Sequence, residues 1–252
     1  MVKIYSPKQI EKIAASGRIL ARVMASITKE VAVGTRLKDL DILAGKSIRE
    51  AGAEPAFLNY KPDGATRPYG AFICTSVNDV VVHGIPSDYK LRSGDVLKLD
   101  FGVLLDGFYS DAAATVVVGV ASPLAQKLID ATREALEKAI KKAKPGNTLG
   151  DIGFEIESTA KKYGFKVVKG LTGHGIGLEL HEDPVLYNYG EKGKGLKLKA
   201  GMVLAIEPMF SAGSDRIIQK KDESWATSDA SLSAHFEHTV AITAAGVKIL
   251  TG

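Results

Sequence analysis

The chain has 252 residues, of which 45% are hydrophobic and 25% charged, and its formal net charge is +4. This balance is typical of a globular protein with one sizeable core and excludes a low-hydrophobicity disordered chain. The lone Cys74 excludes an intrachain disulfide framework and suits a reducing compartment. With no signal-peptide core and no run of ~18 apolar residues, we expect a cytoplasmic protein that has no membrane partner.

Apolar residues at helical spacing predict four helices in two pairs. The first begins at Ser6-Pro7, an N-cap followed by a first-turn proline, and is expected to end near Val33-Gly34. The second is expected between Thr35 and Gly52. The second pair begins with another Ser-Pro step, and its two helices are predicted at 122–146 and 149–164.

The second helix pair repeats features of the first at a constant offset of 112 residues, so that Gly34 aligns with Gly146. Strand-rich stretches follow the pairs, at 71–118 and 167–250. We therefore predict an α+β fold in which helices cover one face of an antiparallel sheet. Because no Pro/Gly/Ser linker divides the chain, residues 1–252 are expected to form a single domain. Its two pseudo-symmetric halves are residues 1–120 and 121–252.

Five side chains end or interrupt apolar strands where an aliphatic residue would be ordinary: Asp100, Asp111, His174, Glu207 and Glu237. Acids are seldom buried unless they are paired or bind a cation. The four ionised carboxylates carry −4 in total, which two divalent ions would neutralise. One imidazole among oxygen ligands favours Mn, Fe(II) or Co over a sulfur-rich zinc site. The pattern predicts a dinuclear centre that hydrolyses its substrate.

The dipeptide Asp106-Gly107 is a strong hairpin signal between two apolar strands. If the residues flanking this turn pair with each other, Asp100 faces Ala113. Asp100 and Asp111 are then diagonal neighbours on one face, with roughly 7–8 Å between the backbones of the two strands at these residues. A one-residue slip would separate them. The alternative for this pair alone is two aspartates facing solvent on an edge hairpin.

Three glycines surround His174 in the segment 173–177, without the strand-turn-helix spacing of a dinucleotide-binding loop. Glycine permits close backbone approach, which suits a crowded site beside a strand. A lone histidine is more often a core or surface residue than a ligand, and Glu237 by itself could be an outward polar position. All five histidines nevertheless lie in or beside the unusual strands: His83, His174, His181, His235 and His238.

Taken together, several motifs resemble the type I methionine aminopeptidases in their short, bacterial form. The motifs are Val82-His83-Gly84-Ile85-Pro86, Asp100 with Asp111, Gly173–Gly177 with His181-Glu182-Asp183-Pro184, Ile206-Glu207-Pro208 and Ser233–Thr239. The resemblance covers essentially the whole chain. It implies the pita-bread fold, two divalent metal ions, and removal of the N-terminal methionine from nascent proteins and peptides, with a small second residue preferred.

The resemblance also implies a role for each of the five unusual side chains. Asp100 would chelate one ion, and His174 with Glu207 would bind the other. Asp111 and Glu237 would bridge both ions.

It further implies three catalytic residues and a methionine pocket. Glu207 would relay a proton, His181 would contact the scissile carbonyl and stabilise its developing charge, and His83 would act near the substrate amide. The substrate pocket would contain, besides His83 and His181, the residues Tyr60, Tyr69, Cys74, Leu180, Met209 and Trp225. Plain core filling is the alternative for Cys74 and Met209.

The sequence departs from the family pattern in two places. Leu180 stands where the bacterial family usually has phenylalanine, and the segment 61–68 is longer than usual. There is no cysteine-rich N-terminal extension and no large insertion between His174 and Glu237, which favours the short bacterial form.

Two rival interpretations remain at this point. A Xaa-Pro peptidase shares the fold and the metal set but carries a further N-terminal domain. A non-catalytic binding module of the same fold would typically have lost metal ligands, whereas all five are present here. We expect the protein to be a monomer whose partners are the N-termini of nascent polypeptides. The basic segment 191–199 is either a solvated loop or a transient contact to the ribosome.

Overall fold

The computed structural model describes residues 1–61 and 65–252. Residues 62–64, which belong to the segment noted above as unusually long, lie outside the described part. The helices in the described part are α1 (Pro7–Lys29), α2 (Leu37–Glu50), α3 (Pro123–Lys142) and α4 (Leu149–Tyr163). They fall within the four stretches predicted from apolar spacing. None of these helices has the length and apolar character needed to cross a membrane.

The ends of α1 follow from local hydrogen bonding. At its start, Ser6 and Gln9 form a capping box, in which each side chain accepts the other residue's backbone N–H. The helix ends four residues before the predicted Val33. Its last turn tightens, because the N–H of Glu30 donates to a carbonyl three residues back, and the Thr35 hydroxyl donates to the freed Glu30 carbonyl at 2.9 Å.

The strands form one large sheet and two small ones. Their bounds are β1 (Glu54–Pro55), β2 (Cys74–Val77), β3 (Val80–Val82), β4 (Val96–Leu105), β5 (Phe108–Val117), β6 (Lys166–Val167), β7 (Thr172–Gly175), β8 (Glu182–Tyr187), β9 (Val203–Ile206), β10 (Met209–Ser211), β11 (Ile217–Gln219), β12 (Trp225–Thr227), β13 (Ser233–His235), β14 (Glu237–Thr243) and β15 (Gly246–Ile249). The large sheet runs β1-β4-β5-β14-β9-β7-β8, with β2 also paired to β4 and β15 to β14. The small sheets are β13-β10-β6 and β11-β12-β3.

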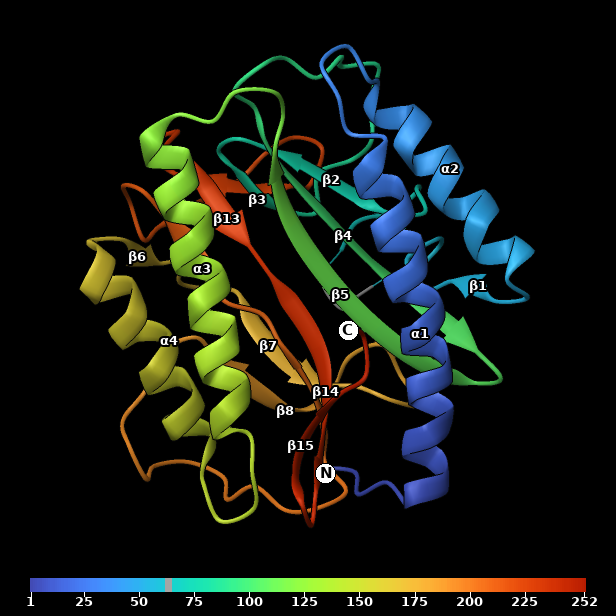
Figure 1. Ribbon diagram of the computed structural model, residues 1–252, viewed down its shortest axis with the longest axis vertical. Helices are drawn as coiled ribbons and strands as arrows, with labels where there is room; N and C mark the ends of the chain where they lie inside the picture. Colours follow the sequence, from blue (N-terminus) through green and yellow to red (C-terminus); the bar gives the residue numbers. More distant parts are fainter. Residues whose placement is uncertain (62–64) are drawn as a thin grey trace.

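All four helices cover one face of the large sheet, with α1 and α2 over one side and α3 and α4 over the other (Figure 1). Leu40 of α2 packs in one core with Leu97 of β4. Ile156 of α4 packs in a second core with Val240 of β14. The predicted α+β architecture, with helices on one face of an antiparallel sheet, is confirmed.

The internal repeat is visible in the backbone. Gly34 and Gly146 both have φ of 91° in the loops that lead into α2 and α4. This left-handed conformation strongly favours glycine, which explains why the sequence repeats glycine there. The two halves nevertheless share one sheet, because β14 of the second half pairs with β5 of the first. The single domain, expected from the absence of a linker, stays a prediction, and the shared sheet is consistent with it.

Candidate metal centre

The hairpin of β4 and β5 has the register predicted from its turn. Asp106 and Gly107 adopt positive φ values of 49° and 78°, and the residues flanking them pair. Asp100 therefore lies opposite Ala113, and Asp111 lies opposite Gly102. The two carboxylates are diagonal neighbours on one face of the hairpin, as predicted.

Strand β14 brings a third carboxylate to the same place. It pairs with β5 on the side away from β4, and Glu237 also lies opposite Ala113. Asp100 and Glu237 thus flank one alanine from its two neighbouring strands. Because the alanine side chain is small, it leaves space between the two acids. Their carboxylates, and a cation bound to them, could occupy this space.

Strands β7 and β9 supply His174 and Glu207. His174 is the register partner of Ala205 in β9, and Glu207 comes immediately after that strand. The Nε2 atom of His174 lies 3.5 Å from Oε1 of Glu207. On the other side of the ring, Nδ1 lies 2.9 Å from the Gly175 carbonyl oxygen. A ring whose Nδ1–H donates to that carbonyl has an unprotonated Nε2, which is the form that binds a metal.

The glycines around His174 are required by the close approach of neighbouring backbones. A Cβ atom on Gly173 would lie 2.4 Å from the Ala205 carbonyl oxygen, and one on Gly175 would lie 2.1 Å from the Asp183 carbonyl oxygen. The glycine-rich motif therefore allows β7 to fit tightly between β8 and β9. This fit places the His174 ring over the carboxylates.

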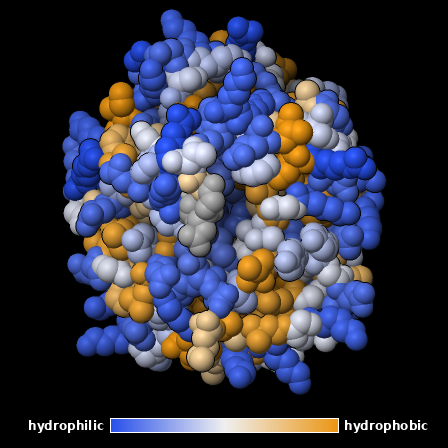
Figure 2. All heavy atoms as spheres, turned by 180° about the vertical axis from the view of Figure 1, so that it is seen from behind, coloured by the Kyte–Doolittle hydropathy of each residue, from blue (hydrophilic) through white to orange (hydrophobic). Residues whose placement is uncertain are grey.

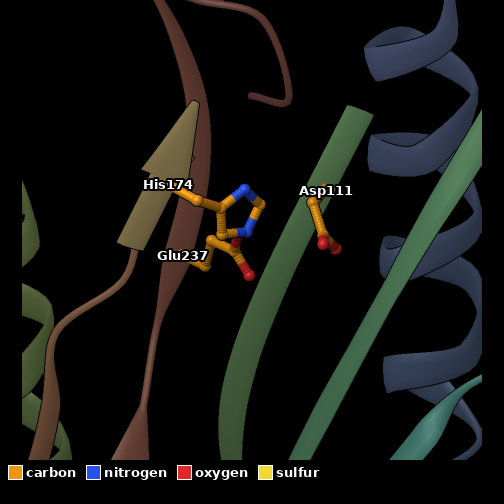
Figure 3. A group of neighbouring side chains, drawn as sticks. All are labelled: Asp111, His174 and Glu237. Carbon is orange, nitrogen blue, oxygen red and sulfur yellow. The ribbon is translucent and has the colours of Figure 1, made fainter. Parts of the chain in front are cut away.

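Side chains from three strands converge on one space. Figure 3 shows Asp111 of β5, His174 of β7 and Glu237 of β14 with their side chains turned toward one another, and their candidate ligand atoms all lie within 4.8 Å of one another. Glu237 also forms a second such group with Glu207 and His235. One buried carboxylate shared by two groups of candidate ligands is the arrangement that a pair of neighbouring ions needs.

Burial disfavours the ionised form of all four carboxylates. Burial raises the pKa of Asp100 and of Glu207 to about 7. Burial, and then the neighbouring carboxylate charges, raise the pKa values of Asp111 and Glu237 well above the usual range. Protein groups alone therefore disfavour four ionised acids here, and a positive charge at their centre would reverse this.

The donor atoms fit divalent cations. Asp111 Oδ1 and Glu237 Oε1 are buried and accept no hydrogen bond from the described residues. Unpaired buried carboxylate oxygens are costly unless a cation fills the gap. Carboxylates with imidazole are the ligands that Mn, Fe(II) and Co prefer. Neither of the two groups of candidate ligands contains a cysteine. Structural zinc sites, in contrast, usually include cysteine thiolates.

The structure adds one residue that the sequence did not assign to the site. His235, at the end of β13, is almost fully buried, and its Nε2 lies 3.4 Å from Oε2 of Glu207. Both of its ring nitrogens lack a hydrogen-bond partner among the described residues. Its signals in the sequence are its position two residues before Glu237 and its place in the motif Ser233–Thr239. Strand β10, which pairs with β13, is distant in the chain.

The two predicted catalytic histidines border this cluster. The ring of His181 packs edge-on against that of His174, with centroids 4.3 Å apart, and its Nδ1 lies 2.5 Å from the Tyr60 hydroxyl. The pKa of His181 is lowered, first by burial and then by the neighbouring His174 and His83. Part of the His83 side chain is open to solvent, yet the protein around its ring displaces enough water to lower its pKa, and His235 adds to this effect.

The predicted pocket residues fall into three places. Cys74 is the register partner of Asp100, and the nearby Tyr69 donates its hydroxyl to the Ile73 or Gly84 carbonyl oxygen. Burial raises the pKa of the Cys74 thiol well above its usual range, so it remains a neutral, soft contact. Met209 and Trp225 share one apolar cluster, whereas Leu180 packs with Tyr60 in another. The three places surround the carboxylates but do not by themselves define a methionine pocket.

An open cavity adjoins His174 and His181. It has a volume of about 480 Å³, and its lining includes Thr172, His174, His181 and Glu179. Figure 2 shows that the face opposite the helices is hollowed near its centre. Of the candidate ligands, His174 lines the cavity.

Comparison with known proteins identifies the family. The chain matches the model of metallopeptidase family M24 over residues 11–244. It is 46% identical to the methionine aminopeptidase of Aquifex aeolicus over 99% of this chain and 98% of that protein. The crystal structure of methionine aminopeptidase from Thermotoga maritima is 41% identical, covers 100% of this chain and superposes with a TM-score of 0.95.

The rival peptidase class is more distant. The prolidase of Pyrococcus furiosus is 26% identical with a TM-score of 0.79, and the match covers 99% of this chain but only 65% of that one. The shared fold confirms the predicted pita-bread architecture, and full-length coverage confirms the resemblance to the type I methionine aminopeptidases. The chain therefore belongs to metallopeptidase family M24 and, within it, to the methionine aminopeptidases.

Proposed function

We propose that this protein is a metal-dependent aminopeptidase that removes the N-terminal methionine from nascent proteins and peptides and prefers a small second residue. The observation that carries this proposal is the convergence of buried carboxylates and His174 on one space, with unpaired oxygens on Asp111 and Glu237. Full-length similarity to methionine aminopeptidases supports the substrate class.

We propose that Asp100, Asp111, His174, Glu207 and Glu237 hold two divalent ions. When bound, such ions would neutralise the carboxylates, activate a water molecule and stabilise the charge that develops during hydrolysis. The chain's own residues would orient the reactants. Glu207 lies between two imidazoles, with one oxygen 3.5 Å from His174 and the other 3.4 Å from His235, and could hold a proton in transit.

His181 is suited to contact the scissile carbonyl. Its lowered pKa keeps the imidazole neutral at pH 7. If the Tyr60 hydroxyl donates to Nδ1, the ring carries its proton on Nε2 and presents that N–H as a donor. A neutral donor aimed at the carbonyl oxygen stabilises the negative charge that develops there. In this interpretation Tyr60 sets the tautomer of His181.

The decisive experiment measures methionine release. Protein freed of metal with a chelator and then supplied with Mn, Co or Fe(II) should release methionine from a Met-Ala-Ser peptide and leave an Ala-Pro peptide intact. The chelated protein should be inactive. Cleavage of the Ala-Pro peptide alone would instead assign the chain to the Xaa-Pro peptidases. Comparing the three metals would rank them, since their ligand preferences overlap.

A non-catalytic binding module is separated from the enzyme by its metal content. Protein purified without chelator should contain bound divalent metal. Near-zero metal, together with no methionine release after reconstitution, would favour the binding module.

We also propose a cytoplasmic monomer that meets its substrates as they are synthesised. The basic segment 191–199 is mostly exposed and offers a surface for a transient contact to the ribosome. Co-sedimentation with ribosomes at low and high salt tests this contact, because an electrostatic contact should weaken as salt rises. Absence from the ribosomal pellet at low salt would leave this segment as a solvated loop.

A further inference from the structure

Lys98 is among the largest fully buried side chains in the described part of the protein, with 1% of its surface exposed. It lies in β4, two residues before Asp100 and on the same face of the strand. None of the ion pairs among the described residues includes it, and the nearby Asp79 is paired with Lys220 at 2.9 Å. A lysine buried without a carboxylate partner is costly and calls for an explanation.

The amine of Lys98 is held by neutral oxygens instead. Nζ lies 2.7 Å from the Asn78 carbonyl oxygen, 3.3 Å from the Ser233 carbonyl oxygen and 3.2 Å from Ser233 Oγ. Three oxygen acceptors match the three N–H donors of an ammonium group, whereas a neutral amine has only two, so the contacts favour the charged form.

These contacts join two segments that are distant in the sequence. Asn78 lies in the turn between β2 and β3, and β3 ends immediately before His83. Ser233 begins β13, and its Oγ also lies 3.0 Å from the Asn78 carbonyl oxygen. Lys98 therefore ties the strand that leads to His83 to the strand that ends with His235.

A neighbouring residue holds the other end of β13. Thr115 of β5 is the register partner of Lys98. Its hydroxyl accepts the His235 backbone N–H at 2.9 Å and donates to the His235 carbonyl at 2.5 Å. Lys98 and Thr115 thus fix both ends of a three-residue strand whose last side chain contacts Glu207.

We propose that Lys98 is a positioning residue, whose ammonium group holds β13 and the β2–β3 turn so that His235 stays against Glu207 and His83 stays at the edge of the site. The inference rests on the proposed aminopeptidase function. Its physical basis is that a hydrogen bond from a charged donor is stronger than one from a neutral donor, and the 2.7 Å contact to the Asn78 carbonyl oxygen has the length expected of such a bond.

The test compares Lys98→Met with Lys166→Met, which removes an exposed lysine from β6, and with wild type, all fully loaded with Mn. In Lys98→Met the kcat for Met-Ala-Ser should fall by ~10-fold or more while KM stays within about 2-fold, because a misplaced catalytic group costs transition-state stabilisation rather than substrate binding. Amide hydrogen exchange of residues 233–235 should accelerate. Lys166→Met should match wild type in both measurements.

Three outcomes would overturn the proposal. One is a wild-type kcat in folded Lys98→Met. Another is a kcat that returns fully when the assay temperature is lowered in step with the loss in Tm, since this would show a loss of stability alone. If Lys98→Met does not fold, Ser233→Ala is the variant that tests the proposal. It removes one of the three acceptors and should lower kcat by ~3-fold. An unchanged kcat in Ser233→Ala would reject the proposal. Failure of wild type to release methionine would reject the proposed function instead, and the exchange comparison would still test Lys98.

Discussion

At the scale of single residues, the site is a set of buried acids that the protein alone does not neutralise. Asp111 illustrates this, because it is buried beside Asp100 and Glu207 and one of its oxygens has no partner among the described residues. Such a group lowers the stability of the metal-free protein, whereas in the metal-bound protein it would act as a ligand. Substitutions at these positions should therefore separate stability from activity.

Replacing Asp111 with asparagine should abolish activity without unfolding the protein. We expect methionine release to fall by ~100-fold or more, because the variant loses one of the charges that we propose hold the ions. Its metal-free Tm should equal or exceed that of the wild type, since a repelling charge is gone. Activity assays, metal analysis and circular dichroism check this. Asp106→Asn, at the exposed turn of the same hairpin, is the matched control, and wild-type turnover in Asp111→Asn would rule out its bridging role.

The raised carboxyl pKa values predict an unusual dependence of stability on pH in the metal-free protein. Asp100 and Glu207 have pKa values of about 7 when folded, against about 4 when unfolded. Between these values the folded state binds more protons than the unfolded state. The free energy of unfolding contributed by these groups therefore falls as pH rises from about 4 to about 7.

Thermal unfolding at about pH 5 and about pH 8, with chelator and with Mn, checks this sign. Added Mn should raise the Tm more at the higher pH, because the ligands must be deprotonated to bind it. The double variant Asp100→Asn, Glu207→Gln should show a smaller pH dependence than the wild type when both are chelated, and Asp111 and Glu237, whose pKa values are also raised, should account for the remainder. An equal effect of Mn at both pH values would contradict the expectation.

At the scale of elements, strand pairing decides which side chains meet. The β4–β5 hairpin sets two acids on one face, and β14 adds a third across Ala113. Strand β7 fits beside β8 and β9 only because glycines flank His174. The position of the imidazole therefore depends on main-chain spacing rather than on side-chain packing.

Gly175→Ala should damage both the fold and the site. The new Cβ would meet the Asp183 carbonyl at 2.1 Å, so β7 or β8 must shift. We expect a loss of about 1–3 kcal/mol in the free energy of unfolding, together with weaker metal binding. Denaturant unfolding and metal titration measure both. Gly70→Ala, where no atom lies within 4 Å of the added Cβ, should be neutral in each, and equal behaviour of the two variants would refute the argument.

At the scale of the whole molecule, both halves contribute to one centre. Asp100 and Asp111 come from the first half, whereas His174, Glu207 and Glu237 come from the second. Each half contributes most of one apolar core, a third apolar cluster combines residues of both halves, and β5 pairs with β14 in the large sheet. Metal bound between them would add to the coupling that this sheet provides.

Calorimetry should therefore show one unfolding transition with or without metal. Mn should move that transition upward as a whole, because the ions would bind only when both halves are folded and paired. Calorimetric and van't Hoff enthalpies that agree would support a single cooperative domain. Two resolved transitions, or a shift of only part of the signal, would mean that the halves unfold separately.

The amino-acid sequence by itself determined the helix pairs, the hairpin register and the five candidate ligands. These follow from local rules: helical spacing with capping residues, the Asp-Gly turn, and the cost of placing acids among apolar residues. A turn of fixed geometry determines every pairing along its two strands, so the facing of Asp100 and Asp111 could be predicted without a structure.

The tertiary structure alone decided which distant residues meet. Lys98 contacts Ser233 across 135 residues of sequence, and His235 reaches Glu207 through strands that no local pattern joins. The candidate pocket residues likewise separate into three places around the site. The physical reason is that local propensities act over one or two turns of chain, whereas the docking of β13 depends on the packing of the whole sheet.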